Sequence, residues 1–107
     1  MSVEEQFAAL VETLTGSSEA VYETRAKGFG SGTLKVSGRI FALLSSRGQL
    51  VVKLPRKRVD ALVAEGVGER FDPGHGRLQK EWLSVTNGEW EPLAREALAY
   101  GARHQHP

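Results

Sequence analysis

Three short apolar segments in the middle of the chain constrain the fold more than any other feature. Polar and apolar residues alternate in Thr33–Ser37, whereas Ile40–Leu44 is apolar on both faces, as a central strand would be. In Gln49–Leu54 every second residue is again apolar. The links Gly38-Arg39 and Arg47-Gly48 are short and contain glycine. This arrangement predicts an antiparallel meander of three strands.

The residues before the meander predict an amphipathic helix. Ser2 and Glu5 have the spacing of a capping box, in which each side chain satisfies a backbone amide of the other. Gly16 is expected to end the helix in a left-handed conformation. The core stripe repeats at intervals of three and four residues and consists of Val3, Phe7, Leu10, Val11 and Leu14.

Two more helices are predicted after the meander. Pro55 is expected at the first position of the second helix, where its missing amide hydrogen has no consequence, and Gly66 is expected to end that helix. A third helix is predicted over Glu89–Arg103, with Glu91 and Arg95 spaced for an ion pair between successive turns.

The remaining segments complete the expected topology. Short strands are predicted at Glu69–Phe71 and Trp82–Thr86, with a turn at Asp72-Pro73-Gly74, and Ser17–Tyr22 is interpreted as a connection. The order of one helix, three strands, a helix, two strands and a helix is an α+β pattern. We therefore expect one domain over residues 1–107, with a five-stranded, mainly antiparallel sheet covered on one face by three helices.

Composition excludes several kinds of chemistry. The chain contains no cysteine, so disulfides, thiolate zinc sites, iron–sulfur clusters and cysteine nucleophiles are absent. The longest purely apolar run is Ile40–Leu44, and Glu4 and Glu5 stand where a signal peptide would be positively charged, so we expect a cytoplasmic protein without a membrane partner. His104 and His106 lack further ligands for a metal. Without a recognisable catalytic constellation, neither an enzyme nor a cofactor is predicted.

Charge is distributed unevenly along the chain although the formal net charge is only +1. Residues 1–23 contain only acidic charged side chains, residues 24–59 contain only basic ones, and residues 60–107 are acidic overall. One interpretation is that the middle segment forms a positive patch. The other is that the acidic helices fold over this segment and neutralise it.

The run Arg56-Lys57-Arg58 is the sharpest local feature. Cations in the first turn of a helix oppose its dipole, but together with the exposed amides they suit a phosphate group. The alternative is a solvated helix start with Asp60 and Glu65 as compensating partners. The complete hypothetical nucleic-acid-binding set is Lys35, Arg39, Lys53, Arg56, Lys57 and Arg58.

Weaker candidates lie elsewhere in the chain. His75, Arg77 and Lys80 form a weak secondary anion-contact hypothesis. Gly28–Gly32 lacks the third glycine of a dinucleotide fingerprint and precedes a strand, which favours a turn. Trp82 is expected in the core, or stacked on a base if its side chain lies on the open face of the sheet.

Two stretches of sequence resemble a known family. They are KGFGSGTLKVSGRIFALL at residues 27–44, followed by a strand containing Lys53, and KEWLSV at residues 80–85. The chain resembles the TfoX/Sxy N-terminal domain family and is similar to the related MmcQ/YjbR family. The resemblance implies a two-layer α+β domain like that of secretion chaperones, roles in regulating competence or in binding DNA, and neither an enzyme nor a cofactor.

Two functions from different classes remain open. The first is a small bacterial regulatory protein that binds nucleic acid through backbone phosphates, with little sequence preference and steep salt dependence. The second is a protein-interaction module, a homodimer or a chaperone-like protein, that does not bind DNA.

Overall fold

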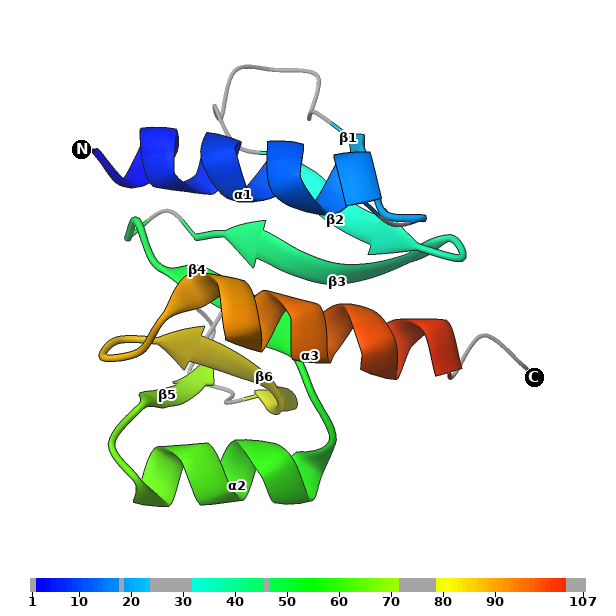
Figure 1. Cartoon of the computed structure of the whole chain (residues 1–107). Helices are drawn as coiled ribbons and strands as arrows, with labels where there is room; N and C mark the ends of the chain where they lie inside the picture. The colour runs from blue at the N-terminus through cyan, green and yellow to red at the C-terminus, as the bar shows by residue number, and fades with distance from the viewer. Residues whose placement is uncertain (1, 18, 24–31, 46, 72–78, 104–107) are drawn as a thin grey trace.

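The chain folds into one antiparallel sheet and three helices (Figure 1). The computed structural model describes residues 2–17, 19–23, 32–45, 47–71 and 79–103. The helices are α1 (Val3–Ser17), α2 (Arg56–Ala64) and α3 (Trp90–Arg103). The strands are β1 (Val21–Glu23), β2 (Thr33–Val36), β3 (Arg39–Leu44), β4 (Leu50–Lys53), β5 (Gly68–Phe71) and β6 (Gln79–Val85). The α+β class and the meander of β2, β3 and β4 are confirmed.

The sheet has six strands in the order β1-β2-β3-β4-β6-β5, so the expectation of five strands was wrong. The additional strand is β1, which pairs with β2 through Val21 opposite Lys35 and Glu23 opposite Thr33. Three residues are too few to show a period of two, so no strand pattern is visible in this segment of the sequence. Pairing with β2 makes it a strand.

The strand register separates the residues of the sheet into two faces. Along one row, directly opposite residues are Glu23, Thr33, Leu43, Val51, Ser84 and Glu69. The adjacent row is Tyr22, Leu34, Ala42, Val52, Leu83 and Arg70. Successive residues of a strand point to opposite faces, so these rows face opposite sides. Leu34, Ala42, Val52 and Leu83 belong to the main core, and their face is the one that the helices cover.

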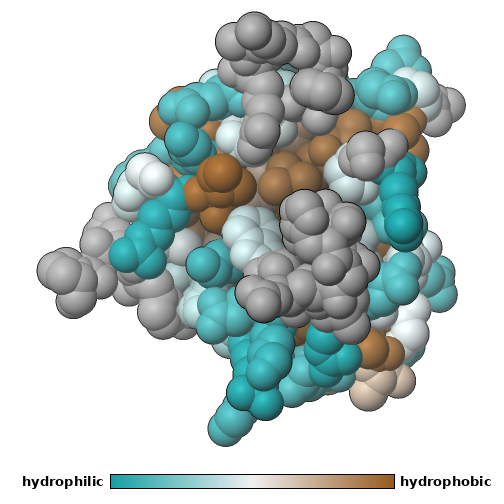
Figure 2. Space-filling view, turned by 180° about the vertical axis from the view of Figure 1, so that it is seen from behind, coloured by the Kyte–Doolittle hydropathy of each residue, from teal (hydrophilic) through white to brown (hydrophobic). Residues whose placement is uncertain are grey.

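The three helices share one hydrophobic core on that face. α3 packs on β3 and β4, α2 packs on β5 and β6, and α1 lies beside β1 and α3 (Figure 1). Phe41, Leu54 and Leu83 are among the largest fully buried side chains. The opposite face, seen from behind in Figure 2, carries no helix of the described residues, although its residues Thr33, Val51 and Ser84 are buried. We call it the open face.

The ends of the helices follow their local chemistry with two exceptions. The capping box is present, because the Glu5 amide donates to Ser2 Oγ and the Ser2 amide donates to Glu5 Oε1. Gly66 follows α2 with φ +79°, and the Val67 amide bonds the Leu62 carbonyl, which is a Schellman ending.

The two exceptions concern Gly16 and Pro55. Gly16 does not end α1 in a left-handed conformation, since the helix runs through it to Ser17. Pro55 is the N-cap of α2, one residue earlier than expected. A difference of one residue at a helix end is small, but it changes which side chains belong to the first turn.

Several element boundaries also differ from expectation. β6 starts at Gln79 and not at Trp82, β5 starts at Gly68 and not at Glu69, and α3 starts at Trp90 and not at Glu89. The predicted turn at residues 72–74 lies outside the described residues. Within the part of the chain that is described, no helix has the length and apolar character needed to cross a bilayer.

Candidate nucleic-acid interface

The first turn of α2 carries two exposed cations, Arg56 and Lys57. Within the described residues, no carboxylate lies within ion-pair distance of either side chain. The N-cap is Pro55, which makes no capping hydrogen bond through its side chain. The first intrahelical bond runs from the Val59 amide to the Pro55 carbonyl. The amides before Val59 therefore have no partner within the helix, so amide dipoles and two cations occupy the same turn.

The third member of the run, Arg58, faces a different partner. Its Nε lies 2.7 Å from Glu96 Oε2 and its Nη2 lies 3.2 Å from Glu96 Oε1. The guanidinium therefore donates two hydrogen bonds to a carboxylate of α3. The hydrogen bond with Glu96 raises the pKa of Arg58, although burial acts in the opposite direction. Arg58 therefore links α2 to α3, and its charge is already matched.

The compensating partners expected for this run are only partly in place. Asp60 pairs with Arg70 of β5 and not with the first turn of its own helix. Glu65 acts on Arg58 through its charge, raising the Arg58 pKa as a minor cause. Glu96, the main partner, was missed because it is 38 residues from Arg58 in the sequence.

The basic residues of the strands have acidic neighbours. Lys35 Nζ lies 2.9 Å from Glu23 Oε1, and Lys53 Nζ lies 4.0 Å from Glu81 Oε1. Arg39, at the start of β3, is exposed and has no ion pair among the described residues. Of the six predicted cations, Arg39, Arg56 and Lys57 thus remain without a close acidic partner in the described structure. The acidic partners of the other three cations lie on β1, β6 and α3, so helix α3 accounts for only one of these pairs.

Trp82 lies on the open face. It is opposite Lys53 in the pairing of β4 with β6, and the neighbouring Leu83 is in the core. Lys53 Nζ is 5.7 Å from the centre of the Trp82 ring, which is a cation–π distance. The ring is half-buried. The expectation of Trp82 in the core was wrong, because the alternation of Trp82 and Ser84 with Leu83 and Val85 separates the two faces without showing which of them the helices cover.

The fold brings several of the candidate elements close to one another. The end of β4, the start of α2 and the start of β6 lie in the lower part of Figure 1, whereas the turn between β2 and β3 lies at the far right, away from them. These elements carry Arg39, Lys53, Arg56, Lys57 and Lys80. Because β4 and β6 are antiparallel neighbours, the end of β4 lies beside the start of β6.

The weak secondary candidates are divided between described and undescribed residues. Lys80 is exposed near the start of β6. His75 and Arg77 lie outside the described residues, as do His104, His106 and residues 28–31 of the glycine-rich stretch. Among the residues that the structure does describe, no group of three or more histidine or acidic side chains has a geometry that could hold a metal ion.

Comparisons of the chain with protein-family models, with curated proteins and with solved structures found no match. The resemblance to the TfoX/Sxy N-terminal domain and MmcQ/YjbR families therefore depends on the sequence stretches quoted for it.

Proposed function

We propose that this chain is a small, non-catalytic bacterial regulatory protein of the TfoX N-terminal or MmcQ/YjbR type, acting in the cytoplasm and binding nucleic acid through backbone phosphates. The contact surface is centred on Arg56 and Lys57 in the first turn of α2. Lys53 at the end of β4 and Lys80 near the start of β6 extend this surface, and Arg39 at the β2–β3 turn is a more distant contact. Lys35 contributes less, because Glu23 neutralises it at 2.9 Å.

The observation that carries the proposal is the uncompensated charge in the first turn of α2. Two cations at the positive end of a helix are unfavourable there by a few tenths of a kcal/mol each, unless an anion is bound. Free amides of a helix start and nearby cations are a recurrent phosphate-binding combination. Arg56 can also form a bidentate contact with a phosphate.

The number of available cations sets the expected salt dependence. If Arg56 and Lys57 each neutralise one phosphate and Lys53 exchanges its 4.0 Å contact with Glu81 for a third phosphate, the logarithm of the binding constant for duplex DNA should fall against the logarithm of the salt concentration with a slope of about −2.7. Such binding is weak and tolerant of sequence.

Fluorescence anisotropy of labelled single- and double-stranded DNA, measured over a series of salt concentrations, tests the proposal. The variant Arg56→Gln with Lys57→Gln should reduce the slope for duplex DNA to about −0.9, because two phosphate contacts are lost. The control Arg47→Gln with Arg95→Gln removes the same net charge from the β3–β4 turn and from α3, and should bind like the wild type. Absence of binding at low salt, or equal weakening in both variants, would contradict the proposal.

The open face favours a second candidate function, a protein-interaction module. Apolar side chains gather near the middle of this face in Figure 2. Val21 on the edge strand β1 is 56% exposed and is a large exposed hydrophobic side chain. Self-association that persists in Arg56→Gln with Lys57→Gln but is lost in Val21→Lys, measured by sedimentation, would favour this function over DNA binding.

A further inference from the structure

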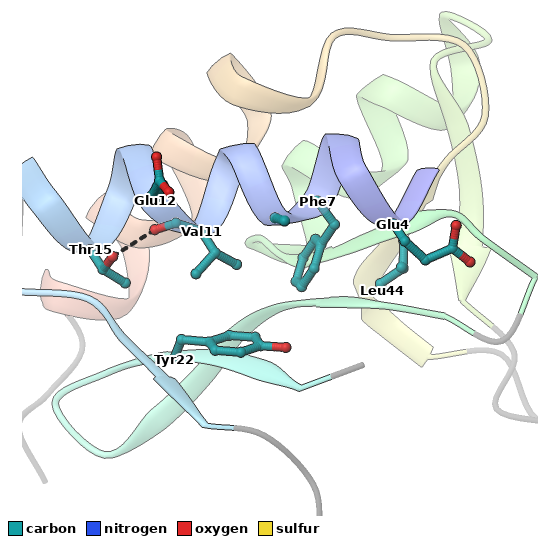
Figure 3. Close-up of a pocket in the computed structure, with 8 residues that line it drawn as sticks. Glu4, Phe7, Val11, Glu12, Thr15, Tyr22 and Leu44 are labelled. Atoms are coloured by element: carbon teal, nitrogen blue, oxygen red, sulfur yellow. Dashed lines mark hydrogen bonds between the residues drawn. The ribbon is translucent and has the colours of Figure 1, made fainter. Parts of the chain in front are cut away.

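A groove with an apolar floor lies between α1 and the sheet, on the helix-covered side of the molecule (Figure 3). Its volume is about 310 Å³. Phe7 and Val11 of α1, Tyr22 of β1 and Leu44 of β3 point toward one another across the groove. This volume is at the lower end of the range of ligand pockets, which suits one large side chain better than an extended cofactor.

The floor of the groove is held in place by the fold. Phe7 and Leu44 are buried members of the main core. The rings of Phe7 and Tyr22 meet edge to face, with centres 6.3 Å apart. The Gly32 amide donates to the Tyr22 hydroxyl over 2.9 Å, which fixes the end of the ring. An incoming apolar group would therefore meet a preformed surface.

The rim of the groove is acidic and uncompensated. Glu4 and Glu12 line the groove from α1 and are exposed. Within the described residues neither carboxylate has a basic side chain within ion-pair distance. The sequence from residue 1 to residue 23 contains no lysine or arginine. The rim therefore attracts cations, in contrast to the start of α2.

The spacing of the two carboxylates defines a pattern in the ligand. Eight helical residues separate Glu4 from Glu12, which corresponds to about 12 Å along the helix axis. In an extended peptide, residues i and i+4 are about 13 Å apart and point to the same side, as does residue i+2 between them. Because Glu12 is also rotated by about 80° around the helix relative to Glu4, two long basic side chains at i and i+4 are needed to reach both carboxylates while the apolar residue at i+2 enters the groove.

We propose that this groove binds an extended segment of a partner protein with the order basic, any, apolar, any, basic. Charge complementarity selects the flanking residues, and the apolar floor selects the central one. This surface is opposite in charge to the first turn of α2 and does not depend on whether the protein binds nucleic acid.

Fluorescence anisotropy with three labelled peptides tests the proposal. The first peptide has the order Arg-Ser-Phe-Ser-Arg, the second replaces both arginines by glutamate, and the third replaces phenylalanine by serine. The wild-type protein should bind the first peptide and bind the other two at least about fivefold more weakly, as expected for losing two exposed ion pairs or one buried anchor.

Two variants of the protein locate the binding. Ala8 is exposed and lines the groove, so Ala8→Trp fills the space from outside the core and should abolish binding. Glu4→Gln with Glu12→Gln should weaken binding about fivefold. The control Glu69→Gln with Glu89→Gln makes the same change in net charge at exposed positions elsewhere and should bind like the wild type. A thermal melt of each variant verifies folding. If Ala8→Trp is unfolded, the binding of the first peptide to Glu4→Gln with Glu12→Gln tests the proposal.

Several results would overturn the proposal. These are no saturation up to about 1 mM of the first peptide, equal binding of the glutamate peptide, or equal weakening by the control pair. A dimer of the wild type in sedimentation that Ala8→Trp dissociates would identify a second copy of the chain as the occupant, and would also overturn it.

Discussion

The contact between Arg58 and Glu96 joins α2 to α3, and its removal should measurably destabilise the fold. The two side chains make a bidentate contact, with nitrogen–oxygen distances of 2.7 and 3.2 Å. We predict that Glu96→Gln lowers the free energy of unfolding, because the guanidinium loses its charged partner while it stays next to α3.

Solvent exposure limits the size of this effect. The side chains of Arg58 and Glu96 are 41% and 36% exposed, so water and salt screen the pair. Exposed ion pairs contribute about 0.2–1 kcal/mol, and bidentate geometry places this pair at the upper end, about 1 kcal/mol. In a domain of this size that corresponds to a decrease in Tm of about 5 °C.

A double-mutant cycle with urea denaturation measures the coupling directly, using Arg58→Gln, Glu96→Gln and the double variant. The pair of Glu91 and Arg95 within α3 provides the matched control, since its side chains are more exposed and make one bond of 2.9 Å. Its expected coupling is about 0.4 kcal/mol. The reasoning is refuted if the Arg58–Glu96 coupling is no larger than that of the control pair. If the proposed phosphate contacts are correct, Glu96→Gln should also strengthen DNA binding, because the charge of Arg58, next to Arg56 and Lys57 in the sequence, is no longer matched by a carboxylate.

Two further predictions concern the sheet edge and the response to alkali. Gly68→Ala should lower the free energy of unfolding by about 2 kcal/mol, because the new Cβ would clash with the Ser84 carbonyl oxygen on β6. Gly16→Ala has open space around the new Cβ and should raise the free energy of unfolding by about 0.5 kcal/mol. Thermal melts of both variants test these two values. Burial, assisted by the charge of Glu81, raises the pKa of Tyr100 above its ordinary value. The unfolded chain therefore releases this proton first, so the contribution of Tyr100 is present below about pH 10 and is lost as the pH rises through the folded-state pKa. Between about pH 9 and pH 11, urea unfolding should show a smaller decrease in the free energy of unfolding for Tyr100→Phe than for the wild type. An equal decrease in the two proteins would show that Tyr100 does not cause the loss of stability.

Local patterns in the sequence were sufficient for most of the secondary structure. The meander followed from period-two alternation and short links, and the capping box of Ser2 and Glu5 from a spacing of three residues. The ion pair of Glu91 with Arg95 followed from helical spacing alone. Each of these features depends on residues that are close in the sequence, so a pattern of residue types determines them.

Features that depend on distant residues could not be obtained in this way. β1 is a strand only because β2 lies beside it, and nothing in three residues shows that. Arg58 is not free to contact a phosphate because it pairs with Glu96, a residue on another helix. The acidic groove at α1 requires Leu44 of β3 to lie under that helix. The sequence located the cations of the candidate site, but only the fold distinguishes paired from unpaired ones.

The position of β6 between β4 and β5 has a consequence for biosynthesis. β4 is complete at Lys53, yet the strand that pairs with its far edge begins only at Gln79. During synthesis, at roughly 5–20 residues per second, that edge stays unpaired until the later segment has left the ribosome. The unpaired strand contains Leu50, Val51 and Val52, which are fully buried in the folded protein. Until β6 is available, this strand can pair with other nascent chains. A premature stop before β6 should therefore yield an aggregating fragment and not a smaller folded domain.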